Sequence, residues 1–240
     1  MTRLDDPTLV ASEYADDERL RRRAAAYTGA GTAIDARSSV VAAVVEAAPK
    51  RILEVGCGWG ELAVWLARDT GADVVAIDLS PRMVELARQR GVDAQVADVQ
   101  SLPFEDGSFD VAVAAWMLYH VPDLDRGIAE LARVLRPGGR LVAVTNSRFH
   151  LFELRELVGS GPSTLSFARE TGAELLSRSF AHVRREDIDG KLQFADRAEV
   201  DAYVRASISM SPFADSLPAH IPEPLEARRA NSIFVAETAA

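Results

Sequence analysis

The sequence predicts an α/β protein whose sheet is mostly parallel and carries helices on both faces. The apolar runs that we expect to form strands lie at residues 51–55, 73–78, 92–97, 109–115 and 140–145. The helices expected between them lie at about 61–69, 80–90 and 125–135. Continuously apolar strands that alternate with helices are typical of a parallel sheet buried on both sides. Such sheets bind ligands beyond the carboxyl ends of their strands, so we expect the site there.

The segments that flank this core predict one domain with helical cover at both ends. Residues 1–11 are expected to form a loose tail, followed by helices at 12–28 and 34–47. Beyond residue 147 we expect helices at 148–158, 170–179 and 196–207, a strand at 181–188, a proline-rich loop at 208–224 and a last strand at 231–238. Asp189 and Gly190 predict a turn behind the strand at 181–188. The predicted division is an N-terminal helical cap at 1–50, a core at 51–146, a cap region at 147–230 and the last strand at 231–240.

Charge and composition exclude several classes of protein. The formal net charge of −9 repels phosphate backbones, and the basic run at 19–23 follows acidic residues in the order that suits a solvated helix. A single cysteine, Cys57, permits no internal disulfide and fits a reducing cytoplasm. The sequence has no signal pattern, no apolar run of membrane-spanning length and no Cys/His metal cluster. We therefore predict a cytoplasmic protein without nucleic-acid partner, membrane or metal, and either a monomer or a homodimer.

A glycine-rich turn follows the first expected strand. The segment from Glu54 to Gly60 has the spacing G-x-G-x-G, which lets the backbone turn tightly and lets a ligand touch the main chain. The dinucleotide fingerprint differs, because its G-x-G-x-x-G spacing places a pyrophosphate on the helix N-terminus. Cys57 lies between two of the glycines and is expected to be a small buried residue. By themselves these glycines also fit a tight turn that binds nothing.

Acidic residues end the next two expected strands. Asp78 stands where a carboxylate can accept hydrogen bonds from both hydroxyls of an adenosine ribose, while Ser80 is expected to cap the following helix. Asp98 follows the third strand, where a carboxylate can accept a hydrogen bond from the exocyclic amine of an adenine. A turn aspartate without a ligand explains Asp98 equally well, so its assignment depends on the motifs around it.

Four segments of the core carry motifs that occur in a fixed order. They are LEVGCGWG (53–60), VVAIDLS (74–80), VADVQSLPFEDGSFDVAVAAWMLYHV (96–121) and LRPGGRLVAVT (135–145). Together they resemble the core of class I S-adenosylmethionine-dependent methyltransferases, of the small-molecule type that includes ubiquinone-biosynthesis C-methyltransferases. The resemblance implies S-adenosylmethionine as cofactor and methyl transfer to an oxygen, nitrogen or carbon of a small molecule. It makes 51–146 the cofactor-binding core and 147–230 the substrate region.

The resemblance also implies a Rossmann-like sheet of seven strands, the last of them antiparallel beside the fifth. The end of the sequence fits, because the last expected strand lacks the crossover helix that a parallel strand needs.

The same resemblance implies which residues surround the methionine part of the cofactor. Gly56 and Gly58 would lie against the methionine part and the ribose. Glu54 would support the site near the methionine ammonium. The backbone of Ala115 and Trp116, at the end of the fourth strand, would face that ammonium.

Four further residues would surround the adenosine part. Asp78 would bind the ribose hydroxyls, and Leu79 would pack on the adenine. Asp98 would meet the adenine amine, with Val99 beside it.

Catalysis of methyl transfer asks for positioning more than for covalent chemistry. Holding the methyl donor and the nucleophile in line and excluding water supplies most of the acceleration, and a base is needed only if the acceptor must lose a proton. His120, with Tyr119 before it, is the nearest candidate base, although a lone histidine beside a strand end is more often structural. Tyr14 and Tyr27 are expected either to close over the cofactor or to pack among the N-terminal helices.

Three other functions stay open at this point. An NAD-dependent oxidoreductase conflicts with the glycine spacing and with Glu54. A member that binds the cofactor but runs another reaction, or none, agrees with every motif. A methyltransferase of nucleic acids would carry a motif such as (N/D)PP(Y/F) after the fourth strand, where this acidic chain has residues 115–118 instead. The acceptor is expected to be recognised by residues 1–30 and 147–224, where an aromatic or apolar wall is suggested by Trp116, Phe149, Phe152, Phe167, Met210 and Phe213.

Overall fold

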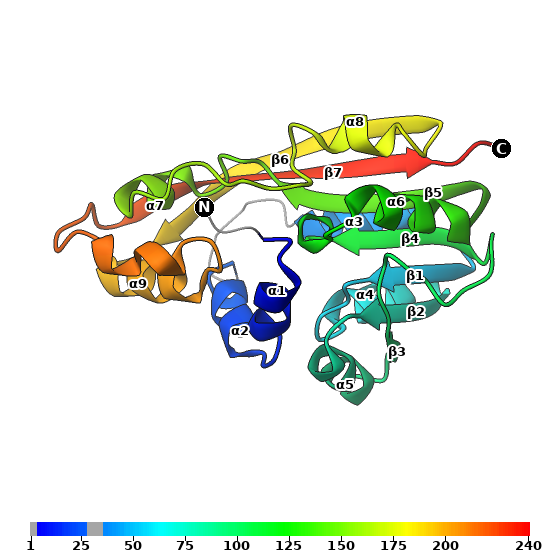
Figure 1. Cartoon of the computed structure of the whole chain (residues 1–240), viewed down its shortest axis with the longest axis horizontal. Coiled ribbons are helices and arrows are strands. Elements are labelled where there is room, and N and C mark those ends of the chain that lie inside the picture. The colour runs from blue at the N-terminus through cyan, green and yellow to red at the C-terminus, as the bar shows by residue number, and fades with distance from the viewer. Residues whose placement is uncertain (1–3, 28–35) are drawn as a thin grey trace.

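The computed structural model describes residues 4–27 and 36–240, and its centre is a sheet of seven strands (Figure 1). The strands are β1 (Arg51–Val55), β2 (Asp73–Asp78), β3 (Asp93–Val96), β4 (Phe109–Ala115), β5 (Leu135–Asn146), β6 (His182–Phe194) and β7 (Leu225–Glu237). Their order across the sheet is β3-β2-β1-β4-β5-β7-β6. The contacts among β1 to β5 are parallel, whereas β7 lies antiparallel between β5 and β6. The predicted fold class, with the last strand antiparallel beside the fifth, is confirmed.

Helices cover both faces of this sheet. The α-helices are α1 (Pro7–Glu13), α2 (Glu18–Ala25), α3 (Ala36–Glu46), α4 (Glu61–Thr70), α5 (Pro81–Gln89), α6 (Leu124–Val134), α7 (Phe152–Leu157), α8 (Gly172–Leu176) and α9 (Arg197–Ala206). Two short 3-10 helices, η1 (Leu118–His120) and η2 (Ser211–Ser216), lie between them. Buried residues of α3, α4 and α5 pack on one face, and those of α6 and α8 pack on the other.

The alternation of side chains along the strands divides the core into two layers. Leu53 and Val55 of β1 belong to the cluster under α6 and α8, whereas Ile52 belongs to the cluster under α3 to α5. Phe234 of β7 is fully buried in the first cluster, where it lies edge-on to Phe167. Successive strand residues point to opposite faces, so a continuously apolar strand supplies both layers at once.

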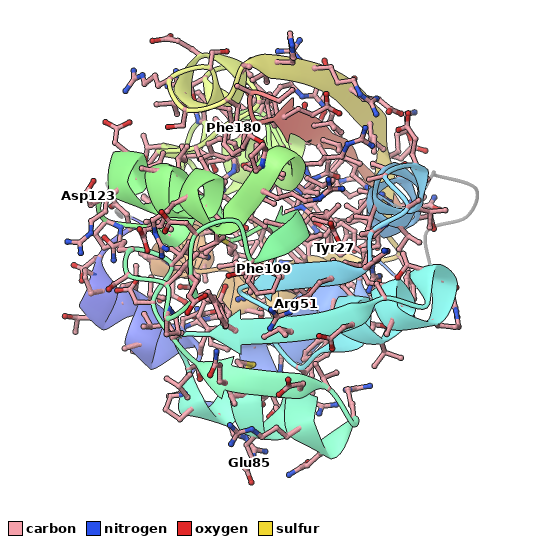
Figure 2. The ribbon with its side chains drawn as sticks, turned by 90° about the vertical axis from the view of Figure 1, so that its right-hand side faces the viewer. Tyr27, Arg51, Glu85, Phe109, Asp123 and Phe180 are labelled. Carbon is pink, nitrogen blue, oxygen red and sulfur yellow. The ribbon has the colours of Figure 1, made fainter. Side chains whose placement is uncertain are left out.

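The amino ends of the parallel strands form the side of the molecule that faces the reader in Figure 2. There the guanidinium of Arg51 lies 4.8 Å from the ring centre of Phe109. The carboxylate of Asp110 accepts hydrogen bonds from the backbone N–H groups of Lys50 and Arg51 at 2.7 and 2.8 Å. Side chains of the chain itself thus close this end of the sheet, and the carboxyl ends point toward α1, α2 and α9 (Figure 1).

Beyond the parallel part of the sheet, β6 and β7 continue as a two-stranded extension. Helices α7 and α9 lie along this extension (Figure 1), and a third apolar cluster fills the space between them. Its fully buried members include Leu154 of α7, Leu192 of β6 and Val204 of α9.

The N-terminal segment differs from its predicted form. A single helix at 12–28 is wrong, because α1 ends at Glu13 and α2 begins at Glu18. The predicted loose tail is also wrong for the described residues from 4 onward. Leu4 is buried, and the Asp6 side chain caps α1 by accepting from the N–H of Thr8 at 2.9 Å. Residues 1–3 and 28–35, which include the start of the helix predicted at 34–47, lie outside the described residues.

The C-terminal strands are longer than predicted. Asp189 and Gly190 form no turn but lie within β6, opposite Ala230 and Arg229 of β7. The last strand starts at Leu225, and the expected loop at 208–224 contains η2. Each long strand spans 13 residues, and their continuous backbone pairing outweighs the local preference of Asp-Gly for a turn.

Two glycines that flank α4 offer a matched test of this packing. Gly60 and Gly71 both have a positive φ, at 79° and 68°. A Cβ at Gly60 would lie 2.9 Å from the Cβ of Ala87, whereas a Cβ at Gly71 would meet nothing within 4 Å. We expect Gly71→Ala to cost about 1–2 kcal/mol of unfolding free energy for the backbone conformation alone. Gly60→Ala should cost about 1–3 kcal/mol more, for overpacking against α5.

Urea unfolding of both variants measures this difference. Equal losses for the two variants would contradict the close approach of Gly60 to Ala87.

Candidate functional site

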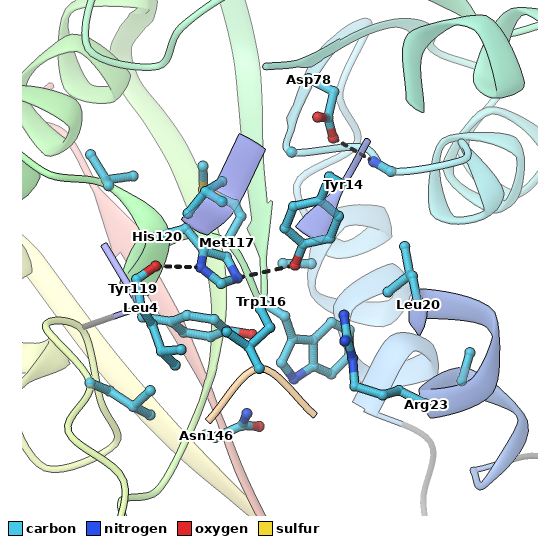
Figure 3. A pocket seen from close by; sticks show the side chains of 18 of the residues that line it. Leu4, Tyr14, Leu20, Arg23, Asp78, Trp116, Met117, Tyr119, His120 and Asn146 are labelled. Carbon is cyan, nitrogen blue, oxygen red and sulfur yellow. Dashed lines mark hydrogen bonds between the residues drawn. The ribbon is translucent and has the colours of Figure 1, made fainter. Parts of the chain in front are cut away.

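One cavity of about 550 Å³ opens beyond the carboxyl ends of the parallel strands (Figure 3). Its walls come from the loops after β1 to β4, from α1 and α2, and from parts of residues 146–231. All fourteen residues that the sequence predicted for cofactor binding or catalysis line it. They are Tyr14, Tyr27, Glu54, Gly56, Cys57, Gly58, Asp78, Leu79, Asp98, Val99, Ala115, Trp116, Tyr119 and His120.

The turn after β1 needs its glycines for two different reasons. Gly56 and Gly58 have positive φ values of 69° and 53°, which side chains rarely adopt. A Cβ on Gly56 would also lie 2.7 Å from the Cβ of Met117. A Cβ on Gly58 would meet only Leu20, at 3.9 Å, so the main chain of Gly58 borders open space in the cavity. Cys57 between them is buried, and burial raises the pKa of its thiol, so it stays an unreactive part of the turn.

Asp78 is held in place by the backbone on both sides. Its Oδ2 accepts from the N–H of Gly58 and its Oδ1 from the N–H of Ser80, each at 2.9 Å. Burial raises the pKa of the carboxyl, and these N–H groups offset part of that effect. Ser80 caps α5 as predicted, since its Oγ accepts from the N–H of Met83. A carboxylate oxygen has more than one acceptor direction, so Asp78 keeps capacity to accept hydrogen bonds from hydroxyls in the cavity.

Glu54 is a buried acid with an unused oxygen. Its exposure is 2%, and its Oε2 has no hydrogen-bond partner among the described residues. Burial, followed by the nearby charge of Asp78, raises the pKa of Glu54 to about 8. A buried acceptor without a partner is costly, and a cationic donor in the cavity would remove that cost. The amino group of a methionine moiety is such a donor, so this site fits the predicted cofactor.

Asp98 has a partner that the sequence did not reveal. The side-chain amide of Gln100 donates to both carboxylate oxygens at 3.1 and 3.0 Å, and its backbone N–H donates to Oδ1 at 2.8 Å. Gln100 accepts in turn from the N–H of Asp123 at 3.0 Å. The carboxylate is thus fixed from one side by the residue two positions along. Leu79 lines the same cavity with half of its apolar side chain exposed, which gives a flat ring a surface to pack on.

Trp116 follows the last residue of β4 and has a strained backbone conformation. Its φ of 55° is unusual for a large side chain and costs about 1–3 kcal/mol. Its backbone N–H donates to the carbonyl of Val144 at 2.9 Å, so the sheet already uses this donor. If the backbone of Ala115 and Trp116 faces an ammonium, as predicted, it does so through carbonyl oxygens, which are acceptors and suit a cation.

Both ring nitrogens of His120 are occupied. Nδ1 lies 2.8 Å from the carbonyl oxygen of Leu4, and Nε2 lies 3.1 Å from the Tyr14 hydroxyl (Figure 3). Because a carbonyl only accepts, Nδ1 carries the proton and Nε2 accepts from Tyr14. Burial lowers the pKa of His120 to about 4, so the ring is neutral near pH 7. In this arrangement His120 holds the N-terminal segment over the cavity, and its basic nitrogen is not open to a ligand.

The two other predicted tyrosines lie at different places in the cavity wall. Tyr119 packs edge-on against His120, and burial raises the pKa of its hydroxyl, which has no hydrogen-bond partner among residues 4–27 and 36–240. Tyr27 lies at the C-terminal side of the cavity, with its hydroxyl 3.0 Å from Nε2 of His150 and 3.2 Å from the Tyr203 hydroxyl. Tyr14 stays close to the loop after β2, because the Ser80 hydroxyl donates to its carbonyl at 2.7 Å.

The cavity also contains residues that no sequence pattern indicated. They include Leu4, Arg23, Gln100, Asn146, His150, Arg155, Tyr203, Ser209 and Arg229. Arg23 belongs to the run expected to form a solvated helix face, and for this residue and Arg19 that expectation is wrong. Both pair with the buried Glu13, and Arg23 also donates to the carbonyl of Ala206 at 2.6 Å. Arg19 and Arg23 differ from the rest of the run because they face α9, a segment far away in the sequence, and donate to its last carbonyls.

Of the six residues suggested for an aromatic or apolar wall, Trp116 and Met210 line the cavity. Phe149, Phe152, Phe167 and Phe213 do not, and Phe167 is instead fully buried in the core. Within the described ranges, no group of three or more His, Cys, Asp or Glu side chains is placed to hold a metal ion. None of the described helices has the length and apolar character needed to cross a membrane.

Comparison with known proteins agrees with this geometry. Residues 53–143 match the family model described as a methyltransferase domain. The chain is 44% identical over 128 residues to the methyltransferase GfsG of Streptomyces halstedii, covering 50% of this chain and 46% of that protein. It is 37% identical over 176 residues to a ubiquinone biosynthesis O-methyltransferase of Xanthomonas oryzae, covering 70% of this chain and 66% of that protein. It thus spans less than two thirds of these relatives.

Among solved structures, the cyclase SpnF superposes with a TM-score of 0.65 at 23% identity, covering 96% of this chain and 95% of that one. This likeness concerns the fold alone. Residues 53–143 thus carry a methyltransferase domain, and the relatives and the fold agree with the predicted class I S-adenosylmethionine-dependent methyltransferase family. The predicted cofactor, S-adenosylmethionine, is the one that this family uses.

Substitution of Asp78 tests the ribose assignment. We expect Asp78→Ala to weaken binding of S-adenosylhomocysteine more than tenfold, because hydrogen bonds to a charged group contribute about 1.5–3 kcal/mol. Asp98→Ala should weaken it less, since a single amine loses its partner. Calorimetric titration of the folded variants provides the affinities.

Asp73→Ala is the matched control, because Asp73 lies at the other, exposed end of the same strand. An unchanged affinity in folded Asp78→Ala would show that Asp78 does not bind the ligand.

The raised pKa of Glu54 predicts how binding depends on pH. Near pH 7 a carboxyl with a pKa of about 8 is mostly protonated, and the ammonium of S-adenosylhomocysteine favours the ionised form. Binding should therefore release close to one proton at pH 7. The affinity should rise roughly tenfold from pH 6 to pH 7 and level off near pH 8. Titration calorimetry in buffers of different ionisation enthalpy measures both quantities.

Glu54→Gln should abolish the proton release and flatten the pH profile. Glu61→Gln is the control, because Glu61 also lines the cavity but pairs with Arg37 at 2.8 Å. A pH profile that survives in Glu54→Gln would assign the titrating group elsewhere.

Proposed function

We propose that this protein transfers the methyl group of S-adenosylmethionine to an oxygen, nitrogen or carbon atom of a small molecule. The observation that carries the proposal is the set of three carboxylates, Glu54, Asp78 and Asp98, around one glycine turn at the mouths of neighbouring strands. They offer acceptors for the ammonium, the ribose hydroxyls and the adenine amine, in the order in which those groups occur in the cofactor. Leu79 and the open main chain at Gly58 add an apolar surface and a close approach.

The bound cofactor would supply an activated methyl group on sulfur, and the protein would supply position and a dry environment. Exclusion of water depends on α1 and α2, which two hydrogen bonds of Tyr14 attach to the core. Arg23 attaches α2 to the end of α9. Both attachments lie on the cavity wall, so the N-terminal segment is suited to close over two ligands that must meet in line.

Neither His120 nor Tyr119 acts as a strong base in the proposed reaction. His120 serves as a positioning residue, because its pKa is about 4 and Tyr14 occupies its basic nitrogen. The Tyr119 hydroxyl is protonated and has room to donate a hydrogen bond to the acceptor. An acceptor that ionises easily, or that reacts as a neutral nucleophile, suits this site best.

The partner implied by this proposal is a small molecule. A cytoplasmic location, the absence of a nucleic-acid partner and a monomeric or homodimeric state stay predictions from the sequence. NAD-dependent oxidation is not supported, because the turn after β1 has the spacing G-x-G-x-G and not the G-x-G-x-x-G of the dinucleotide fingerprint.

Incubation of the protein with a metabolite extract and S-adenosylmethionine labelled in its methyl group tests the proposed reaction. We expect one or a few small molecules to gain the labelled methyl mass, and Asp78→Ala to lose most of this product. The matched Asp73→Ala variant should keep it. Tight binding of the cofactor without any labelled product, across extracts of varied origin, would favour a member repurposed for another reaction. Failure to bind the cofactor at all would overturn the proposal.

A further inference from the structure

The acidic side chains of the cavity wall gather in one part of it, where Arg37 pairs with Glu61. The acids come from the loops after β1 to β3 and the start of α4, and they are Glu54, Glu61, Asp78 and Asp98. In the part of the wall that residues 146–231 form, the charged residues are Arg155 of α7 and Arg229 of β7. In a chain with a net charge of −9, this part of the wall is positively charged.

Arg155 is buried without an acid. Its exposure is 7%, and its terminal nitrogen donates to the Ser209 hydroxyl at 2.7 Å. Its Nε has no hydrogen-bond partner, and no carboxylate among residues 4–27 and 36–240 lies within ion-pair distance. Burial also lowers the pKa of the guanidinium, in keeping with the absence of an acid beside it. Burying a cation without a counter-charge lowers the stability of the fold. Such a residue is typical of a site where a ligand supplies the missing negative charge.

The neighbours of Arg155 do not supply the missing negative charge. His150 accepts at Nδ1 from the backbone N–H of Ala230 at 3.0 Å, so its Nε2 carries the proton and donates to Tyr27. Burial, together with the positive charges of Arg155 and Arg229, lowers the pKa of His150 to about 3. The ring is therefore a neutral member of a hydrogen-bond chain that continues to Tyr203.

Apolar side chains stand beside polar ones, such as Asn146, Ser163, Ser207 and Asn231, in this part of the wall. Leu151, Leu165, Ile208 and Met210 line it, and Trp116 and Met117 line the region toward the glycine turn. A ligand that fills the space therefore needs an apolar body and one group that can satisfy a guanidinium.

We propose that Arg155 binds an oxyanion of the methyl acceptor, a carboxylate or a phosphate, so that the substrate is an anionic small molecule with an apolar body. This inference rests on the proposed methyl transfer and names its substrate class. A planar guanidinium presents paired N–H groups that match two oxygens of one anion, which fixes orientation as well as position. Arg155 would thus orient the acceptor from the side of the cavity away from the carboxylates that bind the cofactor.

Matched pairs of charged and neutral probes test this assignment. The protein is first saturated with S-adenosylhomocysteine, and that titration reports on cofactor binding by itself. Benzoate, phenylacetate and hexanoate are then titrated beside their primary amides, and phenyl phosphate beside phenol. We expect at least one anion to bind about tenfold more tightly than its neutral partner. Preference for the carboxylates or for phenyl phosphate identifies which oxyanion the site takes.

The variant Arg155→Gln should remove this preference and leave the affinity for the neutral partners within about twofold. Arg155→Lys should retain part of it, because the charge remains while the paired N–H groups are lost. Arg178→Gln is the matched control, since Arg178 is an exposed arginine of the surface that pairs with Asp125 and does not line the cavity.

Two results would overturn the inference while the proposed function stands. One is saturable binding of S-adenosylhomocysteine with no anion preferred over its neutral partner in the wild-type protein. The other is an anion preference that survives in folded Arg155→Gln. The wild-type comparison needs no variant, so it decides the question even if Arg155→Gln does not fold. Absence of S-adenosylhomocysteine binding would instead contradict the proposed function itself.

Discussion

Three consecutive backbone N–H groups of the turn after β1 point at the end of β2, and the rest of the cavity depends on them. Those of Gly56 and Cys57 both donate to the carbonyl of Ile77, at 2.8 and 3.0 Å, and that of Gly58 donates to the Asp78 side chain. This contact requires the left-handed backbone at Gly56 and Gly58. It also places Asp78 close enough to Glu54 for its charge to help raise the pKa of Glu54. The turn therefore positions both acids and also exposes the main chain of Gly58 to the cavity.

The cavity is assembled at the expense of folding stability. Glu54 and Arg155 each leave a buried polar atom without a partner, and Trp116 holds a backbone conformation that large residues avoid. Such costs are tolerated in a protein whose two apolar layers and long β6–β7 pairing supply stability elsewhere. The unpaired atoms also belong to an acid and to a guanidinium, and they lie on different parts of the wall. Two different ligand groups can therefore form hydrogen bonds with Glu54 and with Arg155 separately.

The core could be predicted from the sequence because its signals are local. Apolar runs, the Ser80 cap and the glycine turn each depend on residues a few positions apart. Residues 51–146 adopt the expected strands and helices, except that β5 begins at Leu135 and not at residue 140. The same local logic failed where distant segments meet. The break between α1 and α2 accompanies contacts of Tyr14 with Ser80 and His120, and Gly190 stays in a strand because β7 pairs with it. Arg155 lies in no motif, and only the folded chain shows that it is buried without an acid.

The N-terminal helices are attached on two sides, and this bears on how ligands enter and leave. Tyr14 connects α1 to the loops after β2 and β4, whereas Arg19 and Arg23 connect α2 to the carbonyls of Arg205 and Ala206 at the end of α9. A displacement of this helix pair opens the cavity toward the glycine turn and toward Arg155 together. In the proposed function, exchange of the two ligands is therefore coupled through these helices. The residence time of each ligand then depends on the same contacts of α1 and α2, even though the residues assigned to the cofactor and to the acceptor are different.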